Sequence, residues 1–293
     1  MGFLKALFSG KVESAEDQVK EKEARNFDVL KYDGVRAMRT GQLAYAQECF
    51  QHALEYQDDL EVREHLSDVL TRQGNIRGGL EQLRRLIAAE PNNIDLLLKA
   101  AYLSFMEEEY EQMLEFSNQV LALDANYAEA YYLQARAQDG MGNSVAAVAL
   151  LTQAIALNES YGNAYLQRAG LLLKMGDAES AQKDVAYLLE HVSDNEDVFL
   201  MKARVEKALG NGEEALHYYN KVIETNPFCV EAFRERGALR LEQGDKDGAT
   251  EDMRTVLELD PDTTAGVTGD FTGEGIEEKV RQAYRNVDPL GIF

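Results

Sequence analysis

The sequence predicts an all-α fold, a solenoid built from antiparallel helix pairs that stack as repeats. Turn glycines, helix-ending prolines and small residues each return at a step of 34 along the 293-residue chain. The composition also favours helix, because the chain has only 4 prolines and is rich in alanine, leucine, glutamate and glutamine. One helix pair cannot bury its own apolar face, so several pairs must stack.

The prolines reveal the period first. Pro227 and Pro261 are one step of 34 residues apart, and Pro91 lies four steps before Pro227. Proline lacks a backbone N–H and cannot continue a helix, so these positions mark the end of the second helix of a unit. The intervening steps fall on Ala125, Glu159 and Ser193, two of which end similar helical stretches.

Glycines mark the turn between the two helices of a unit, since glycine readily adopts the left-handed backbone that ends a helix. They occur at Gly74, Gly142, Gly176, Gly210 and Gly244. Gly41 is one residue out of phase, which makes the first unit 33 residues long, and Glu108 breaks the series. Small residues allow the paired backbones to approach closely, in the first helices at Ser67, Ala101, Ala135, Ala169, Ala203 and Gly237 and in the second at Ala147, Ala181, Ala215 and Ala249.

This pattern resembles the tetratricopeptide repeat (TPR) family, most clearly in EAFRERGALRLEQGDKDGATEDMRTVLELDP at 231–261. The resemblance implies a right-handed superhelical solenoid of about seven repeats, which we place at 27–59, 60–93, 94–127, 128–161, 162–195, 196–229 and 230–263.

The chain departs from the family pattern at several positions. Arg63 occupies the place of a bulky aromatic that opens the first helix elsewhere, as Tyr131, Tyr165, Phe199 and Phe233. Three residues further on, the usual leucine is replaced by polar residues, at Gln134, Arg168, Lys202 and Arg236. Repeat three lacks the turn glycine and has Met113 in place of alanine, so we expect it to pack irregularly.

Two segments flank the array. Residues 1–26 form an amphipathic and charged lead-in, in which Phe3, Leu4, Leu7 and Phe8 share one helical face. This face either folds back onto repeat one or anchors the chain to a partner or a membrane surface. Residues 264–293 comprise a loop, a capping helix at about 274–287 and a tail, DPLGIF, which docks on the last repeat or binds a partner.

Charge excludes some classes of function. The chain has 52 acidic and 30 basic residues, a net charge of −22, which argues against binding to nucleic acid and to anionic membranes. Cys49 and Cys229 lie in no metal or redox motif and are interpreted as reduced thiols. The sequence shows no secretory signal and no long apolar span, so we expect a cytoplasmic protein.

The motif search gives no catalytic constellation. None of the four histidines belongs to an HExxH motif, and neither a Walker A nor a GxSxG sequence occurs. We therefore predict that the chain is not an enzyme and uses no cofactor and no metal.

The resemblance implies a concave groove lined by the first helices, which binds peptides or partner segments at repeat positions 2, 5, 9 and 12. Carried onto this sequence, the groove residues are Leu98, Tyr102, Phe105, Tyr132, Arg136, Leu166, Leu200 and Arg204. An acidic edge is formed at position 2 by Glu61, Asp95, Glu129, Asp197 and Glu231. Two alternatives remain open: the apolar residues could pack between adjacent first helices, and the acids could complement helix dipoles.

The first functional hypothesis is a non-catalytic protein–protein interaction scaffold that binds a partner segment with basic and apolar residues. Its groove is centred on Tyr102, Phe105, Tyr132 and Arg136, since aromatic and arginine side chains dominate binding energy at such centres. The second is an assembly or targeting factor that acts through its two ends, with the solenoid as spacer. A third is a sensor of small molecules or signal peptides.

Overall fold

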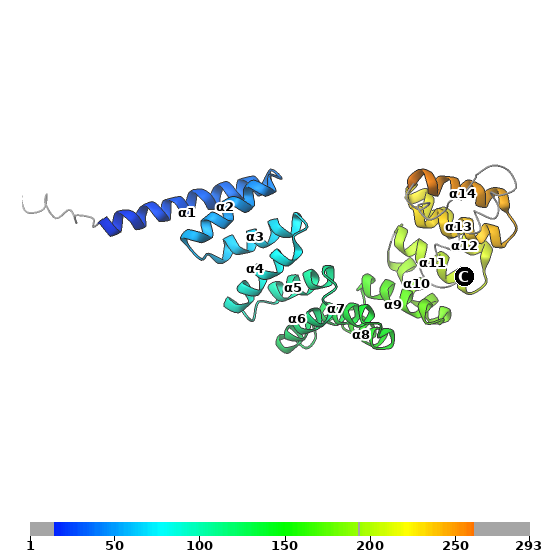
Figure 1. Cartoon of the computed structure of the whole chain (residues 1–293). Helices are drawn as coiled ribbons and strands as arrows, with labels where there is room; N and C mark the ends of the chain where they lie inside the picture. Colours follow the sequence, from blue (N-terminus) through cyan, green and yellow to red (C-terminus); the bar gives the residue numbers. More distant parts are fainter. Residues whose placement is uncertain (1–14, 193, 261–293) are drawn as a thin grey trace, which may run out of the picture. The chain divides into compact units, whose positions relative to one another are not determined.

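The computed structural model describes residues 15–192 and 194–260, and Figure 1 shows their arrangement. Within these residues the chain forms fourteen α-helices and no strand. They are α1 (Ala15–Arg39), α2 (Leu43–Tyr56), α3 (Leu60–Arg72), α4 (Ile76–Ala89), α5 (Ile94–Met106), α6 (Tyr110–Leu123), α7 (Ala128–Gly140), α8 (Ser144–Leu157), α9 (Gly162–Lys174), α10 (Ala178–His191), α11 (Glu196–Ala208), α12 (Gly212–Thr225), α13 (Val230–Glu242) and α14 (Lys246–Leu259). The predicted amphipathic face at residues 3–8, the capping helix and the C-terminal tail lie outside the described residues.

The helices belong to two compact units that meet between Met141 and Gly142. In the first unit α1 packs on α2, α3 on α4 and α5 on α6, and each second helix also packs on the next first helix. In the second unit α9 packs on α10, α11 on α12 and α13 on α14 in the same manner. The predicted all-α fold of consecutive helix pairs is therefore confirmed.

The turns within the helix pairs share one backbone conformation. Six glycines adopt left-handed values of φ between 77° and 87°, at Gly41, Gly74, Gly142, Gly176, Gly210 and Gly244. Glu108 takes the same place in the third pair with a φ of 58°. The amide of Glu109 donates to the carbonyl of Ser104 at 2.8 Å, as Asn75 does to Leu70 at 2.9 Å, so the third turn is closed like the second.

The expectation that repeat three packs irregularly is wrong. Its helices α5 and α6 have 13 and 14 residues, the same lengths as α3 and α4. Met113, which replaces the usual alanine, is fully buried. The left-handed backbone of Glu108 replaces the missing glycine, and the core accommodates the larger side chain.

Helix α1 begins before the first repeat. It has 25 residues, and its side chains from Gln18 to Arg25 are exposed, whereas Phe27 is buried. The charged lead-in is therefore helical from Ala15 onwards.

The polar residues that replace leucine in the first helices are held by ion pairs and hydrogen bonds. The guanidinium of Arg168 donates to both carboxylate oxygens of Asp184 on α10, at 2.6 and 2.8 Å. Arg236 binds Asp252 of α14 in the same way, at 2.5 and 3.1 Å. Both aspartates are buried, so each pair replaces an apolar contact with a charged one inside the helix pair.

Candidate functional site

Helices α5 and α7 bring five of the predicted residues together. The guanidinium of Arg136 lies 3.6 Å from the ring centroid of Phe105 and 5.8 Å from that of Tyr132. The hydroxyl of Tyr102 donates to a carboxylate oxygen of Glu129 at 2.7 Å. We call Tyr102, Phe105, Glu129, Tyr132 and Arg136 the α5–α7 cluster.

Helical periodicity explains why these side chains meet. Tyr102 and Phe105 are three residues apart on α5, and Glu129, Tyr132 and Arg136 follow a three- and four-residue spacing on α7. Each set therefore occupies one helix face, and α5 and α7 are in contact as neighbouring first helices. Asn93 fixes the start of α5, because its side chain accepts a hydrogen bond from the amide of Leu96.

The cluster is partly open to solvent. Tyr102, Phe105, Glu129 and Arg136 are half-buried, whereas Tyr132 is buried with 9% of its surface exposed. Among the described residues, no acid forms an ion pair with Arg136, whose charge is stabilised by the faces of the two rings. The guanidinium thus presents hydrogen-bond donors beside an apolar surface.

The predicted acidic edge is largely engaged within the chain. Lys31 lies 2.6 Å from Glu61, and its hydrogen bond lowers the pKa of the Glu61 carboxyl. Glu129 accepts from Tyr102, and in the second unit Glu231 pairs with Arg204 at 3.1 Å. Asp95 and Asp197 are exposed. Three of the five acids therefore join adjacent first helices, and all five lie in first turns, where a negative charge is favourable.

The second unit holds the other predicted groove residues. Arg204 of α11 contacts both carboxylate oxygens of Glu235, at 2.6 and 3.0 Å. The buried Tyr219 hydroxyl donates to the same carboxylate at 3.0 Å, and burial together with this charge raises the pKa of Tyr219 well above its usual value. Arg204 is thus used to hold α11, α12 and α13 together.

Three predicted groove residues are packed instead of presented. Leu98, Tyr132 and Leu200 are 7%, 9% and 7% exposed, and Leu200 belongs to a core cluster of α11, α12 and α13. These three residues therefore serve mainly as packing residues between helices. Leu166 is half-buried on α9. The predicted groove residues that stay half-buried are Tyr102, Phe105 and Arg136 of the α5–α7 cluster and Leu166 and Arg204 of the second unit.

Sequence reasoning missed the buried ion pairs, although a signal was present. The separation of Arg168 from Asp184 is 16 residues, and Arg236 and Asp252 repeat it two periods later. Two charge pairs in the same register indicate a contact between the first and second helices of a repeat.

Comparison with known proteins agrees with this architecture. Two family models of the tetratricopeptide repeat match residues 128–161 and 200–263. A tetratricopeptide repeat protein from Parabacteroides merdae superposes with a TM-score of 0.69 over 89% of this chain and 100% of its own, at 18% identity. The chain therefore contains tetratricopeptide repeats and has the fold of tetratricopeptide-repeat proteins.

One further solved structure shares the fold, and two curated proteins share part of the sequence. YrrB, a TPR protein with an unusual peptide-binding site, superposes with a TM-score of 0.50 over 61% of this chain and 93% of its own, at 19% identity. Two proteins of Arabidopsis thaliana are similar in sequence. The CTR9 homolog is 25% identical over 196 residues, and the DnaJ protein P58IPK homolog is 28% identical over 85 residues. These alignments cover 66% and 29% of this chain, but only 17% and 18% of the two plant proteins.

None of the helices in the described ranges is both long enough and apolar enough to cross a bilayer. The cytoplasmic location stays a prediction.

Proposed function

We propose that this TPR protein is a non-catalytic interaction scaffold whose α5–α7 cluster binds an extended segment of a partner protein. The observation that carries the proposal is the half-buried Arg136 stacked on Phe105 and Tyr132 between two adjacent first helices. Proteins of this family generally act as scaffolds, and YrrB, which has this fold, has a peptide-binding site.

The chemistry of the cluster defines the partner segment. The rings of Tyr102 and Phe105 offer apolar surface for a hydrophobic side chain, which gains affinity by leaving water. The N–H groups of Arg136 can donate to a backbone carbonyl of an extended chain. Asp95, exposed in the first turn of α5, favours a basic residue nearby. The partner segment therefore combines apolar and basic residues.

The test compares two matched pairs of substitutions in the full chain. Tyr102→Ala with Arg136→Ala removes one half-buried ring and the guanidinium of the cluster. Tyr32→Ala with Arg36→Ala removes another tyrosine–arginine pair, in which the guanidinium lies 6.0 Å from a ring that is 69% exposed on α1. A partner isolated with the wild-type protein is then titrated against all three proteins.

The cluster variant is expected to bind at least about 30-fold more weakly, the effect of losing a binding hot spot, while the α1 variant binds like wild type. Circular dichroism checks that both variants keep their helices. Equal affinity of the cluster variant and the wild type would show that the partner binds elsewhere.

A further inference from the structure

Repeat two contains a polar notch where repeat five contains two stacked rings. In the repeat register, Arg63 and Arg85 occupy the positions of Tyr165 and Tyr187, which lie three periods later. Tyr165 and Tyr187 stack with their centroids 4.2 Å apart and fill the space between the helices. Two arginines cannot fill this space as two stacked rings do, and a cavity of about 290 Å³ remains between α2, α3 and α4.

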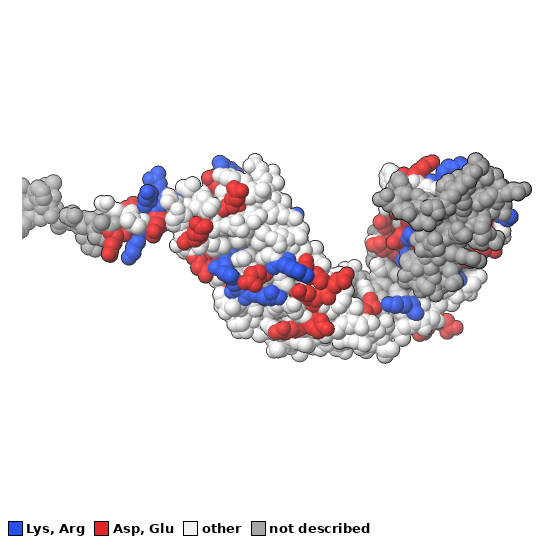
Figure 2. Space-filling view, in the orientation of Figure 1, with Lys and Arg blue, Asp and Glu red and all other residues white. Residues whose placement is uncertain are grey.

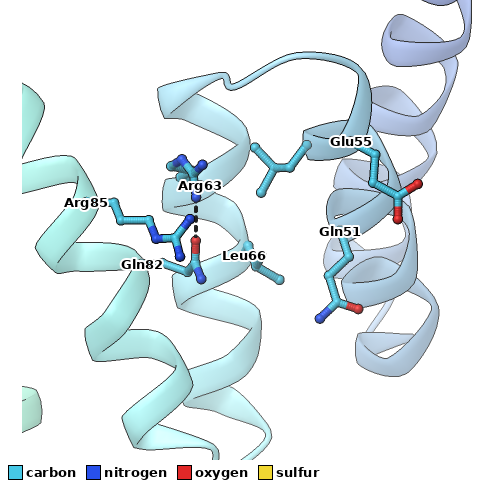
Figure 3. Close-up of a pocket in the computed structure, with 7 residues that line it drawn as sticks. Gln51, Glu55, Arg63, Leu66, Gln82 and Arg85 are labelled. Carbon is cyan, nitrogen blue, oxygen red and sulfur yellow. Dashed lines mark hydrogen bonds between the residues drawn. The ribbon is translucent and has the colours of Figure 1, made fainter.

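Most polar groups around the notch are hydrogen-bond donors. Figure 3 shows Arg63 and Arg85 pointing toward one another from α3 and α4, with Gln51 and Glu55 on α2 across the opening. Gln82 accepts from Arg63 at 3.0 Å, which leaves its amide NH₂ as a donor. Leu66 lies between the two sides, and Glu55 is the only acid among the lining residues.

The arginines keep donor capacity for a ligand. Arg63 is nine-tenths buried and donates from Nε to Asp58 and from Nη1 to Gln82, while Nη2 makes no hydrogen bond to any other described side chain. Arg85 is paired only with Glu81, at 3.3 Å, in an exposed contact that costs little to break. A carboxylate accepts two parallel hydrogen bonds from a guanidinium, which makes it the group that best matches these donors.

Repeat two is less acidic than the chain as a whole. Repeat two holds five arginines and five acids in a chain whose net charge is −22, and it has no lysine. Figure 2 shows basic side chains interleaved with acidic ones around α4 in the first unit. Asp58 from the preceding loop already bonds to Arg63, and Arg63 and Arg85 together lower the pKa of its carboxyl. A carboxylate is therefore stabilised at this place.

We propose that the notch between α2, α3 and α4 binds the carboxylate of an acidic side chain in a partner protein. The site is distinct from the α5–α7 cluster, because second helices supply most of its lining and the ligand has the opposite charge. Neither site depends on the other for its chemistry.

The experiment is a titration of the full-length protein, labelled with ¹⁵N, by two blocked pentapeptides that carry a central Glu or a central Gln between Leu and Gly residues. The arginine Nε–H signals of Arg63 and Arg85 report binding directly. The Glu peptide is expected to shift both signals with saturation, and the Gln peptide is expected to shift neither. A phosphoserine peptide of the same sequence forms a third arm.

Substitutions of neighbouring arginines distinguish binding in the notch from a general attraction between the charged protein and the peptide. Arg85→Gln is expected to lower the affinity for the Glu peptide about tenfold, the effect of losing a charged hydrogen bond. Arg84→Gln, the matched control on the same helix, should bind like wild type because Arg84 faces Gln112 of α6 and Glu109, which precedes that helix. Arg63→Tyr restores the family residue, preserves the fold and should abolish binding.

Three results would overturn the proposal. The first is no saturable shift with the Glu peptide. The second is equal weakening by Arg84→Gln and Arg85→Gln, which would indicate bulk electrostatics. The third is binding of the phosphoserine peptide alone, which would assign the notch to a phosphorylated partner. None of these results bears on the α5–α7 cluster.

Discussion

At the scale of single residues, Glu108 shows how the fold tolerates a local exception. A side chain in the left-handed region is strained because its Cβ approaches the backbone, at a cost of about 1 kcal/mol or more. The closing hydrogen bonds of the turn and the burial of Met113 outweigh this cost. Sequence comparison of the repeats correctly locates the turn, but it cannot show that the backbone stays the same when glycine is absent.

Glu108→Gly is expected to stabilise the protein by about 0.5 kcal/mol, because glycine relieves the strain and loses part of this gain to chain entropy. The matched control is Gly74→Ala, where φ is +82° and no atom lies within 4 Å of the added carbon. It should destabilise the protein by a similar amount. Urea unfolding followed by circular dichroism measures both, and a loss of stability in Glu108→Gly would refute the explanation.

The sequence predicts where the residues of the candidate site lie in the repeats, but only partly which partners they bind within the chain. Repeat positions correctly place Tyr102, Phe105 and Arg136 on neighbouring first helices, because helical spacing fixes the face on which a side chain lies. They do not reveal that Arg204 is bound by Glu235, or Glu61 by Lys31, 31 and 30 residues away. Such partners depend on distances across the repeat interface, which the sequence alone does not provide.

At the scale of helices, the period predicts where elements lie, and ion pairs explain its polar exceptions. Hydrophobic periodicity treats Arg168 as a surface residue, yet it is bonded to Asp184, whose side chain is 6% exposed. Removing one partner of a buried pair leaves an uncompensated charge, whereas replacing both with apolar residues often costs little. We therefore expect the pair to add little net stability to the contact between α9 and α10.

This account predicts different outcomes for single and double substitutions. Asp184→Ala should destabilise the protein by about 3 kcal/mol, because the Arg168 guanidinium loses its buried partner. Arg168→Met combined with Asp184→Val should lie within about 1 kcal/mol of wild type, since apolar residues of comparable size then occupy both sites. Denaturant unfolding measures both variants. A double variant less stable than Asp184→Ala would contradict this interpretation.

At the scale of the whole molecule, the chain consists of two compact units, and both proposed binding sites lie in the first. The sequence predicts a groove spread over repeats three to six, because each repeat offers residues at equivalent positions. In the second unit, Leu200 is packed in the core and Arg204 is bound by carboxylates, while Leu166 is half-buried. We therefore expect the first unit to carry most of the binding energy.

The central claim is that the α5–α7 cluster contacts a partner, and site-specific photo-crosslinking tests it most directly. A photoreactive phenylalanine analogue replaces Tyr102 in one protein and the exposed Tyr32 in a second, and further proteins carry it at Phe3 or Phe293 near the two ends. Each is irradiated in native lysate, and the cross-linked peptides are identified by mass spectrometry. We predict one partner cross-linked from position 102 but not from 32, through a segment with apolar and basic residues. Cross-links to the same partner only from positions 3 or 293 would contradict this account and make the chain ends the binding elements.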